Sequence, residues 1–236
     1  AAKMEVGLGI DISDATTVRK YAETWVRLTK TGRITENSET NLIRAMENHI
    51  FPYIGPMRVR DVRASHILNI MQRCSGLSRG TQGYILSTMR AVFNAAADDG
   101  IILRSPVPLS LRPGGAKPAE TEALTSEQLA EFLDKTRDLS VWPVIYAISQ
   151  TGMRRSEATG LMWSDVDTES LVIHIRRHAV TSSAGRVTVE KGAKTDAGVR
   201  DIPITAEFAN WLVLRRKSAT SVFVFPNRKG GCYSSG

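Results

Sequence analysis

The chain has 236 residues, 42% of them hydrophobic and 6% aromatic, and its 31 Lys and Arg against 24 Asp and Glu give a formal net charge of +7. This length suits one large domain or two modest ones, and the apolar fraction excludes a disordered polymer. No run approaches the ~20 apolar residues of a membrane span, and no signal peptide opens the sequence. Two cysteines are too few for a disulfide framework, which predicts a cytoplasmic protein that makes no membrane contact.

The first predicted domain is helical. Residues 1–15 show no hydrophobic period and are predicted to be a tail or a linker remnant. Apolar side chains then recur at helical spacing after Thr16 or Thr17, either of which could cap a helix. Two prolines and a glycine in residues 49–56 predict that the second helix stops before them. Four helices are expected within a domain of residues 16–104, and they cover 17–32, 36–48, 65–74 and 81–98.

A boundary rich in proline and glycine follows. Residues 105–120 hold four of the nine prolines, so they are predicted to be an interdomain linker. In the second domain, residues 121–236, Thr125 and Gln128 have the spacing of a capping box. Leu129, Phe132 and Leu133 are expected to form the buried face of that helix. Further helices are predicted at 141–150, 154–162 and 205–216, and strands at 171–177, 185–190 and 199–204. The fold class is therefore mainly α with a small antiparallel β-sheet.

The positive charge is segregated along the chain. Residues 1–115 and 152–236 each carry a net charge of +5, whereas residues 116–151 carry −3. Two basic blocks that face one polyanion would produce this pattern, although a solvated basic surface gives the same total.

The motif richest in chemistry starts at Thr151-Gly152. It places Arg154 at the start of a helix after a glycine turn, and a guanidinium can bind two phosphate oxygens at once. Glu157 lies three residues later on the same face and can orient this arginine. The spacing alone is equally compatible with a surface arginine pair and a helix salt bridge.

The sequence TGMRRSEATGLMWSDVD (residues 151–167) resembles the first arginine box of the tyrosine recombinases, the phage-integrase family. The family pattern is T-G-hydrophobic-R-x-S-E followed by L-x-W-x-D-hydrophobic-D. The resemblance implies that Arg154 is the catalytic, phosphate-binding arginine and that Glu157 supports it. Arg155 occupies a variable position and receives no role.

A second segment, KGAKTDAGVRDIPI (residues 191–204), resembles the β-hairpin of the same family. The resemblance implies that Lys194 is the catalytic lysine, with Lys191 as the alternative, and that Thr195 and Arg200 contact DNA. A lysine on a hairpin can donate a proton to a leaving 5′ oxygen. Without the arginine box, a solvated lysine would be the simpler interpretation. A phosphate-binding P-loop is excluded because its first glycine is missing.

The first domain resembles the family's core-binding domain through HIFPYIGPMRVRDVRASHI and LSRGTQGYILSTMRAVFNAAADDGIILRSPV. This resemblance implies a four-helix, SAM-like unit that grips DNA, followed by an α+β catalytic domain. Arg79, Thr81 and Arg90 are the positions expected to touch phosphates or groove edges. A solvated helix face is the alternative interpretation of each.

The resemblance implies a site-specific recombinase or integrase that integrates or excises a phage or mobile element through a 3′-phosphotyrosyl intermediate. It implies no metal and no cofactor. The expected partners are double-stranded DNA attachment sites, further copies of the chain in a recombination tetramer, and accessory excisionase or DNA-bending proteins.

Two elements of the family pattern are not found in these residues. The second box, H-x-x-R, belongs after Pro226 and the nucleophilic tyrosine later still, so Tyr233 is not assigned as the nucleophile. The chain as given is therefore expected to bind DNA without cleaving it. One alternative is a truncated, non-catalytic relative that regulates recombination. Another is a metal-dependent nuclease, for which the best carboxylates are Asp165, Asp167 and Glu169.

Overall fold

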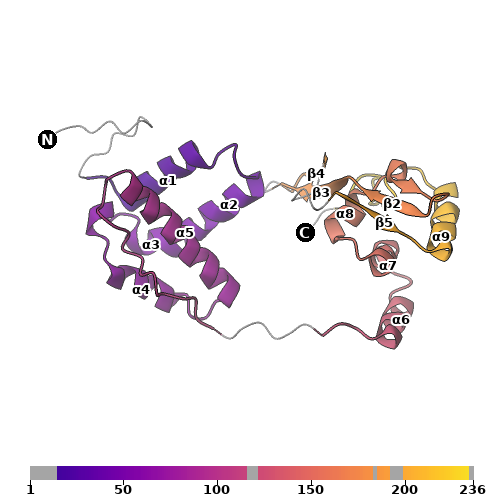
Figure 1. Cartoon of the computed structure of the whole chain (residues 1–236), viewed down its shortest axis with the longest axis horizontal. Coiled ribbons are helices and arrows are strands. Elements are labelled where there is room, and N and C mark those ends of the chain that lie inside the picture. The colour runs from indigo at the N-terminus through magenta and orange to yellow at the C-terminus, as the bar shows by residue number, and fades with distance from the viewer. Residues whose placement is uncertain (1–14, 116–121, 183–184, 192–198, 234–236) are drawn as a thin grey trace. The chain divides into compact units, whose positions relative to one another are not determined.

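The computed structural model describes residues 15–115, 122–182, 185–191 and 199–233. The chain divides into two compact units, residues 1–121 and 122–236, and each has its own hydrophobic core (Figure 1). The first unit is helical and the second combines helices with small antiparallel sheets, so the predicted fold class is confirmed. In the described ranges, no helix is long and apolar enough to span a bilayer.

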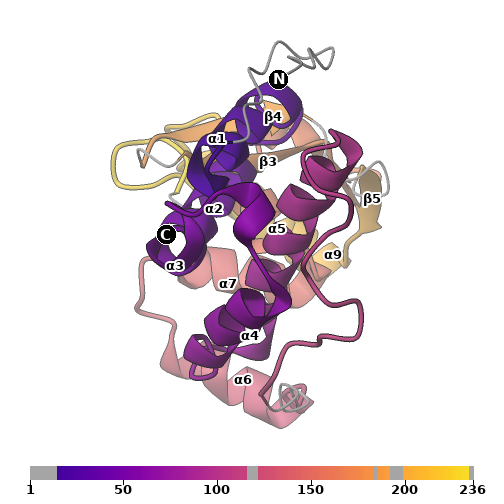
Figure 2. The same ribbon diagram turned by 90° about the vertical axis from the view of Figure 1, so that its left-hand side faces the viewer.

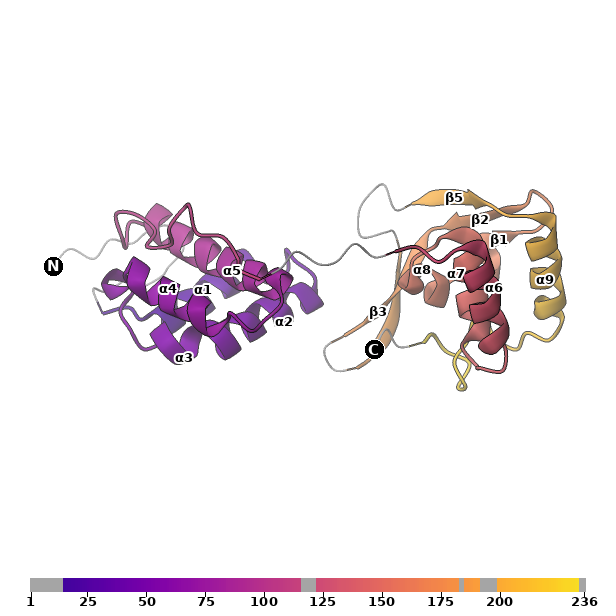
Figure 3. The same cartoon turned by 90° about the horizontal axis from the view of Figure 1, so that it is seen from below.

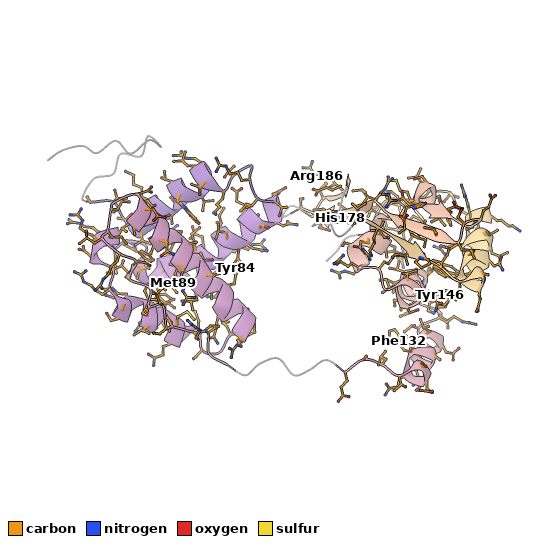
Figure 4. All side chains as sticks on the ribbon, viewed as in Figure 1. Tyr84, Met89, Phe132, Tyr146, His178 and Arg186 are labelled. Atoms are coloured by element: carbon orange, nitrogen blue, oxygen red, sulfur yellow. The ribbon has the colours of Figure 1, made fainter. Side chains whose placement is uncertain are left out.

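The first unit is built around the long helix α5. This helix packs against α1, α2 and the turn that follows α2, and Figure 2 shows it among the shorter helices. Met89, labelled in Figure 4, is fully buried, as are Ile85 and Leu86 on the same helix. The helices of this unit are α1 (Val18–Thr29), α2 (Glu36–Ala45), α3 (Phe51–Ile54), α4 (Ala64–Arg73) and α5 (Arg79–Asp98).

Several of these helices have a hydroxyl-bearing residue as their N-cap. Thr17 is the N-cap of α1, and its side chain accepts a hydrogen bond from the Lys20 backbone N–H. Ser78 does the same for α5, with Thr81 as the donor. Helix α4, expected to begin at Ser65, begins one residue earlier, at Ala64, with Arg63 as its N-cap. At the start of α4, the ring Nδ1 of His66 accepts a hydrogen bond from the Arg63 backbone N–H at 3.0 Å.

The break predicted across residues 49–56 is also wrong. Helical structure continues from α2 through a π-helical turn, Met46–Ile50, directly into α3. The Phe51 N–H bonds to the Met46 carbonyl, five residues back. Pro52 then falls in the first turn of α3, where a missing N–H costs little. The wider turn therefore accommodates the proline that the prediction took as a helix breaker.

The segment after α5 lies on the first unit. Val107 is buried in its core, and Arg90 on α5 donates from Nη2 to the carbonyls of Leu111 at 2.6 Å and Pro108 at 3.4 Å. The Gly114 backbone N–H donates to the Gln82 side chain at 2.9 Å. Over its described residues, 105–115, the predicted linker is thus packed onto α5.

Over its described residues, the second unit combines α-helices with small antiparallel sheets (Figure 3). Strands β1 (Val166–Asp167), β2 (Val172–Ile175) and β5 (Arg200–Pro203) form an antiparallel sheet in the order β1-β2-β5. Strands β3 (Arg177–Thr181) and β4 (Val187–Lys191) form a separate antiparallel hairpin. The helices are α6 (Ser126–Lys135), α7 (Trp142–Thr151), α8 (Arg155–Gly160) and α9 (Ala206–Lys217).

Two strand predictions need correction. The run predicted as one strand, residues 171–177, is divided because β2 ends at Ile175 and β3 begins at Arg177 in the other sheet. Strand β1 was not expected at all. It is only two residues long and follows a 3₁₀ turn, Trp163–Asp165, so it has too few residues to show an alternating pattern.

Helix α6 has the predicted cap but not the predicted buried face. Thr125 and Gln128 exchange the two hydrogen bonds of a capping box. Phe132, however, is 42% exposed, and Leu129 and Leu133 are only half-buried. Among the described elements, this helix packs mainly against α7, where the Trp142 indole N–H donates to the Leu133 carbonyl. A single neighbour cannot cover a full apolar stripe.

An aromatic cluster joins α7 to α9 in the core of the second unit. Tyr146, labelled in Figure 4, stacks on Trp142 with ring centroids 5.0 Å apart and meets Phe208 and Trp211 edge-on. These ring contacts therefore hold α7, the helix that leads into the arginine box, against α9.

Candidate active site

The candidate site begins where α7 ends. Gly152 has φ of 64°, a left-handed conformation that favours glycine, and its N–H bonds to the Ile148 carbonyl. Met153 is then buried in the core, and Arg154 has extended backbone as the N-cap of α8. The glycine turn therefore reverses the chain and places Arg154 at the start of the next helix.

Glu157 is the buried centre of the site, with 3% of its side chain exposed. Its Oε2 accepts the Arg154 backbone N–H at 2.8 Å, and its Oε1 accepts the Arg154 Nη1 at 2.8 Å. Arg200 on β5 binds the same carboxylate in a bidentate manner, from Nη1 to Oε1 at 3.0 Å and from Nη2 to Oε2 at 2.9 Å. One carboxylate thus joins two arginines that are 46 residues apart in the chain.

The protonation of Glu157 follows from these contacts. Burial raises the pKa of its carboxyl, but the hydrogen bonds from Arg200 and Arg154 outweigh burial and hold that pKa at about 2. The hydrogen bonds to Glu157 also raise the pKa of Arg200 above its ordinary value. The carboxylate is therefore ionised at neutral pH, and it cannot act there as a proton donor.

The Arg154 guanidinium binds Glu157 through one edge, and its other edge is accessible to a ligand. The Arg154 side chain is 66% exposed, and within the described ranges its guanidinium donates one hydrogen bond, from Nη1 to Glu157. The remaining edge can present two donors to an anion in the planar geometry that suits phosphate. The site therefore combines a fixed support with an accessible cation.

Close packing fixes α8 on the β3–β4 hairpin. A Cβ added to Gly160 would lie 2.7 Å from the Ala179 backbone N and 2.9 Å from the His178 carbonyl carbon. Only glycine permits this approach of helix to strand. Figure 4 labels His178 and Arg186, which belong to this hairpin and its connecting turn.

The two lysine candidates differ in what can be said of them. Lys194 and the predicted DNA contact Thr195 lie outside the described residues. Lys191 is the last residue of β4, paired in register with Arg177. The choice between Lys191 and Lys194 stays a prediction.

Arg200 has a role that sequence reasoning missed. Its DNA contact stays a prediction, and the structure shows in addition that its guanidinium lies on the buried Glu157 carboxylate. The signal was the period of two in β5, where Arg200 shares a face with the buried Ile202. The sheet side chains on that face point into the unit.

Of the three residues predicted to contact DNA in the first unit, Arg79 and Arg90 share one face of α5, and Thr81 lies on another face. Arg90 binds backbone carbonyls of its own unit, and Arg79 approaches the Gly115 carbonyl at 3.4 Å. Exposed Thr81 instead lines a cavity of about 390 Å³ between α5 and α2. The other polar or exposed side chains around this cavity are Asn41, Arg44, Asn48, His49 and Tyr84.

Two of the three carboxylates considered for a metal-dependent nuclease, those of Asp165 and Asp167, stabilise turns. Asp165 is 3% exposed, pairs with Arg177 at 2.8 Å and accepts the Met162 backbone N–H. Asp167 accepts the backbone N–H groups of Glu169 and Ser170. In the part of the chain that the structure describes, no group of three His, Cys, Asp or Glu side chains is placed to hold a metal ion.

Comparisons with known proteins agree with this architecture. Residues 18–110 match the phage integrase central domain. The chain is 23% identical to a "Tyrosine recombinase XerC-like" protein of Caldanaerobacter subterraneus subsp. tengcongensis, over 255 aligned residues. The alignment covers 97% of this chain, which spans 64% of the length of that relative.

Two solved structures share the fold. The Tn1549 transposon integrase in complex with transposon right end DNA has a TM-score of 0.79 at 22% identity, covering 93% of this chain and 74% of that one. A lambda integrase tetramer bound to a Holliday junction has a TM-score of 0.69 at 14% identity, covering 99% of this chain and 66% of that one. Residues 18–110 therefore match the phage integrase central domain, and the chain as a whole is similar in sequence to a tyrosine recombinase and in fold to integrases.

Proposed function

We propose that this chain is the DNA-gripping and phosphate-activating part of a site-specific recombinase that breaks and rejoins DNA through a 3′-phosphotyrosyl intermediate. The observation that carries this proposal is Arg154, which is exposed at the start of α8 and supported by the buried Glu157. A fixed cation of this kind stabilises the charge that builds on a phosphate during transfer.

In the proposed reaction a tyrosine oxygen attacks the scissile phosphorus, and the bond from phosphorus to the 5′ oxygen breaks. Arg154 binds non-bridging oxygens and stabilises the pentacoordinate phosphate. Lys194, or Lys191 in its place, gives a proton to the departing 5′ oxygen. A 5′ hydroxyl of a partner strand then attacks the phosphotyrosyl bond and releases the tyrosine. Because the covalent link conserves the energy of the broken bond, no ATP is required.

The first unit is proposed to hold the duplex through the cavity between α2 and α5. Asn, His, Thr and Tyr side chains around it can bond to base edges or phosphates, and Arg44 adds a positive charge. Residues 1–115 carry a net charge of +5, which favours a polyanion. The similarity to integrases described in complex with DNA supports this assignment.

We expect the 236-residue chain by itself to bind DNA without forming a covalent adduct. Tyr21 and Tyr146 contribute to the packed interiors of their units, and Tyr233 packs against the core of the second unit. The test is a suicide substrate that traps phosphotyrosyl intermediates, applied with sequences selected by this chain from a randomised duplex pool. A mobility shift without an adduct that survives denaturation is the expected result, and an adduct would contradict it.

Assembly on DNA is proposed as well. A tetramer of this chain with two attachment sites, aided by excisionase or DNA-bending proteins in the cytoplasm, would bring two sites together for strand exchange. Light scattering of the chain with a selected duplex measures the stoichiometry. One chain per half-site, with no pairing of duplexes at micromolar concentration, would refute self-association by the 236 residues.

A further inference from the structure

Arg200 contacts the candidate site through Glu157. It lies on β5, whereas Arg154 and Glu157 lie on α8 and its cap, so the contact ties the sheet to the helix that carries the candidate catalytic arginine. The Arg200 side chain is 32% exposed, and both of its Nη atoms are directed at the buried carboxylate.

The acceptor capacity of Glu157 is filled by this arrangement. A carboxylate offers about four acceptor positions. Arg154 uses two of them, through its backbone N–H and Nη1, and Arg200 uses the other two. No acceptor position is left to draw in the outer edge of the Arg154 guanidinium.

We propose that Arg200 is a positioning residue that keeps Arg154 available to phosphate by occupying the acceptor positions through which Glu157 would otherwise neutralise it. The inference rests on the proposed function, since it assumes that Arg154 binds a DNA phosphate. Without Arg200, two vacated acceptor positions would lie beside the flexible, 66% exposed Arg154 side chain. The Arg154 guanidinium would then turn onto Glu157 and form the bidentate pair that Arg200 now forms.

The test measures the affinity of the chain for a selected duplex across a salt series. Arg200→Met is expected to lower the affinity about tenfold and to reduce the salt slope by about one phosphate contact. The decisive variant is the double substitution Arg200→Met with Glu157→Gln, which is expected to restore most of the affinity because the neutral amide oxygen can still accept a hydrogen bond from Arg154 but does not form a bidentate ion pair with it. Arg228→Met, on an exposed side chain, is the matched control for the loss of one positive charge.

A structural role for Arg200 alone would give the opposite result, because removing a second buried group does not repair a fold. Two outcomes would overturn the inference. In one, Arg200→Met lowers the duplex affinity and the added Glu157→Gln does not restore it. In the other, Arg200→Met lowers the affinity no more than Arg228→Met does. If Arg200→Met does not fold, Arg200→Lys replaces it, since one ammonium cannot fill both oxygens of Glu157. Arg200→Lys is then expected to lower the duplex affinity in part, and the added Glu157→Gln is expected to restore it. A loss of affinity that Glu157→Gln does not restore would again contradict the inference.

A second readout needs no DNA. Phenylglyoxal modifies accessible guanidinium groups, and peptide mass spectrometry follows Arg154 with Arg228 as the internal reference. Arg200→Met is expected to slow modification of Arg154 several-fold, and Glu157→Gln in the same chain is expected to restore it. If the wild-type chain binds no duplex, the proposed function is wrong. If phenylglyoxal modifies Arg154 equally fast in the wild-type chain and in Arg200→Met, the proposed role of Arg200 is wrong.

Discussion

The depressed pKa of Glu157 predicts how the stability of the second unit depends on pH. The carboxyl has an ordinary pKa of about 4.5 and a folded-state pKa of about 2. Because the folded pKa is the lower one, ionised Glu157 stabilises the folded state above about pH 4.5, and this contribution is lost as the pH falls towards 2. The shift corresponds to about 3 kcal/mol at neutral pH, of which about 2 kcal/mol is lost between pH 7 and pH 3.

The measurement compares the wild-type chain with Glu157→Gln by urea unfolding between pH 7 and pH 3. Three of the four tryptophans lie in the second unit, so fluorescence reports mainly on it. Other carboxyls with depressed pKa values, such as those of Asp167 and Asp201, are common to both proteins and cancel in the difference. The gap in unfolding free energy is expected to narrow by about 2 kcal/mol on acidification. A gap that stays constant with pH would refute the reasoning.

Three further predictions concern packing and the two faces of α5. Gly160→Ala should lower the unfolding free energy of the second unit by about 1–3 kcal/mol in urea titrations, because the added Cβ would clash with backbone atoms of β3, which cannot move aside. Gly83→Ala is the control, because the nearest atom to its Cβ would be a Pro113 side-chain atom at 3.8 Å, and it should be neutral or stabilising. Arg90→Met should destabilise the first unit by about 1–3 kcal/mol while lowering duplex affinity no more than a neutral surface substitution does. Tyr84→Ala should do the reverse, with a loss of affinity of about fivefold and an unchanged melting temperature; equal effects of these two substitutions on affinity would contradict the assignment of faces.

Local signals in the sequence were sufficient for most of the helices. Capping residues such as Thr17, Thr125 and Thr205 lie directly before an apolar stripe, and each begins a helix in the structure. The arginine box was located by its resemblance to the family pattern, because its spacing alone is equally compatible with a surface salt bridge. Arg154 and Glu157 accordingly meet as expected.

What the sequence did not reveal depends on contacts between distant segments. The exposed face of α6 follows from how few elements pack on it, which no property of Phe132 encodes. The partner of Arg200 lies 43 residues away, and resemblance assigned it to DNA because it follows the lysine hairpin. The carbonyls that Arg90 binds belong to a proline-rich segment that composition alone marks as a linker. In each case the observed contact depends on tertiary packing, which the local sequence pattern does not encode.

The π-helical turn at Met46–Ile50 sets a strict length requirement on this part of the chain. An α-helix advances by 100° per residue, so deleting one residue here would restore ordinary helical spacing and rotate everything after it by about that angle. Phe51 and Ile54, now 3% and 1% exposed, would turn out of the core, and Asn48 and His49 would shift along the cavity that they line. This segment can therefore tolerate some substitutions, but it cannot tolerate insertions or deletions. Homologous recombinases that keep the cavity between α2 and α5 are therefore expected to align here without gaps.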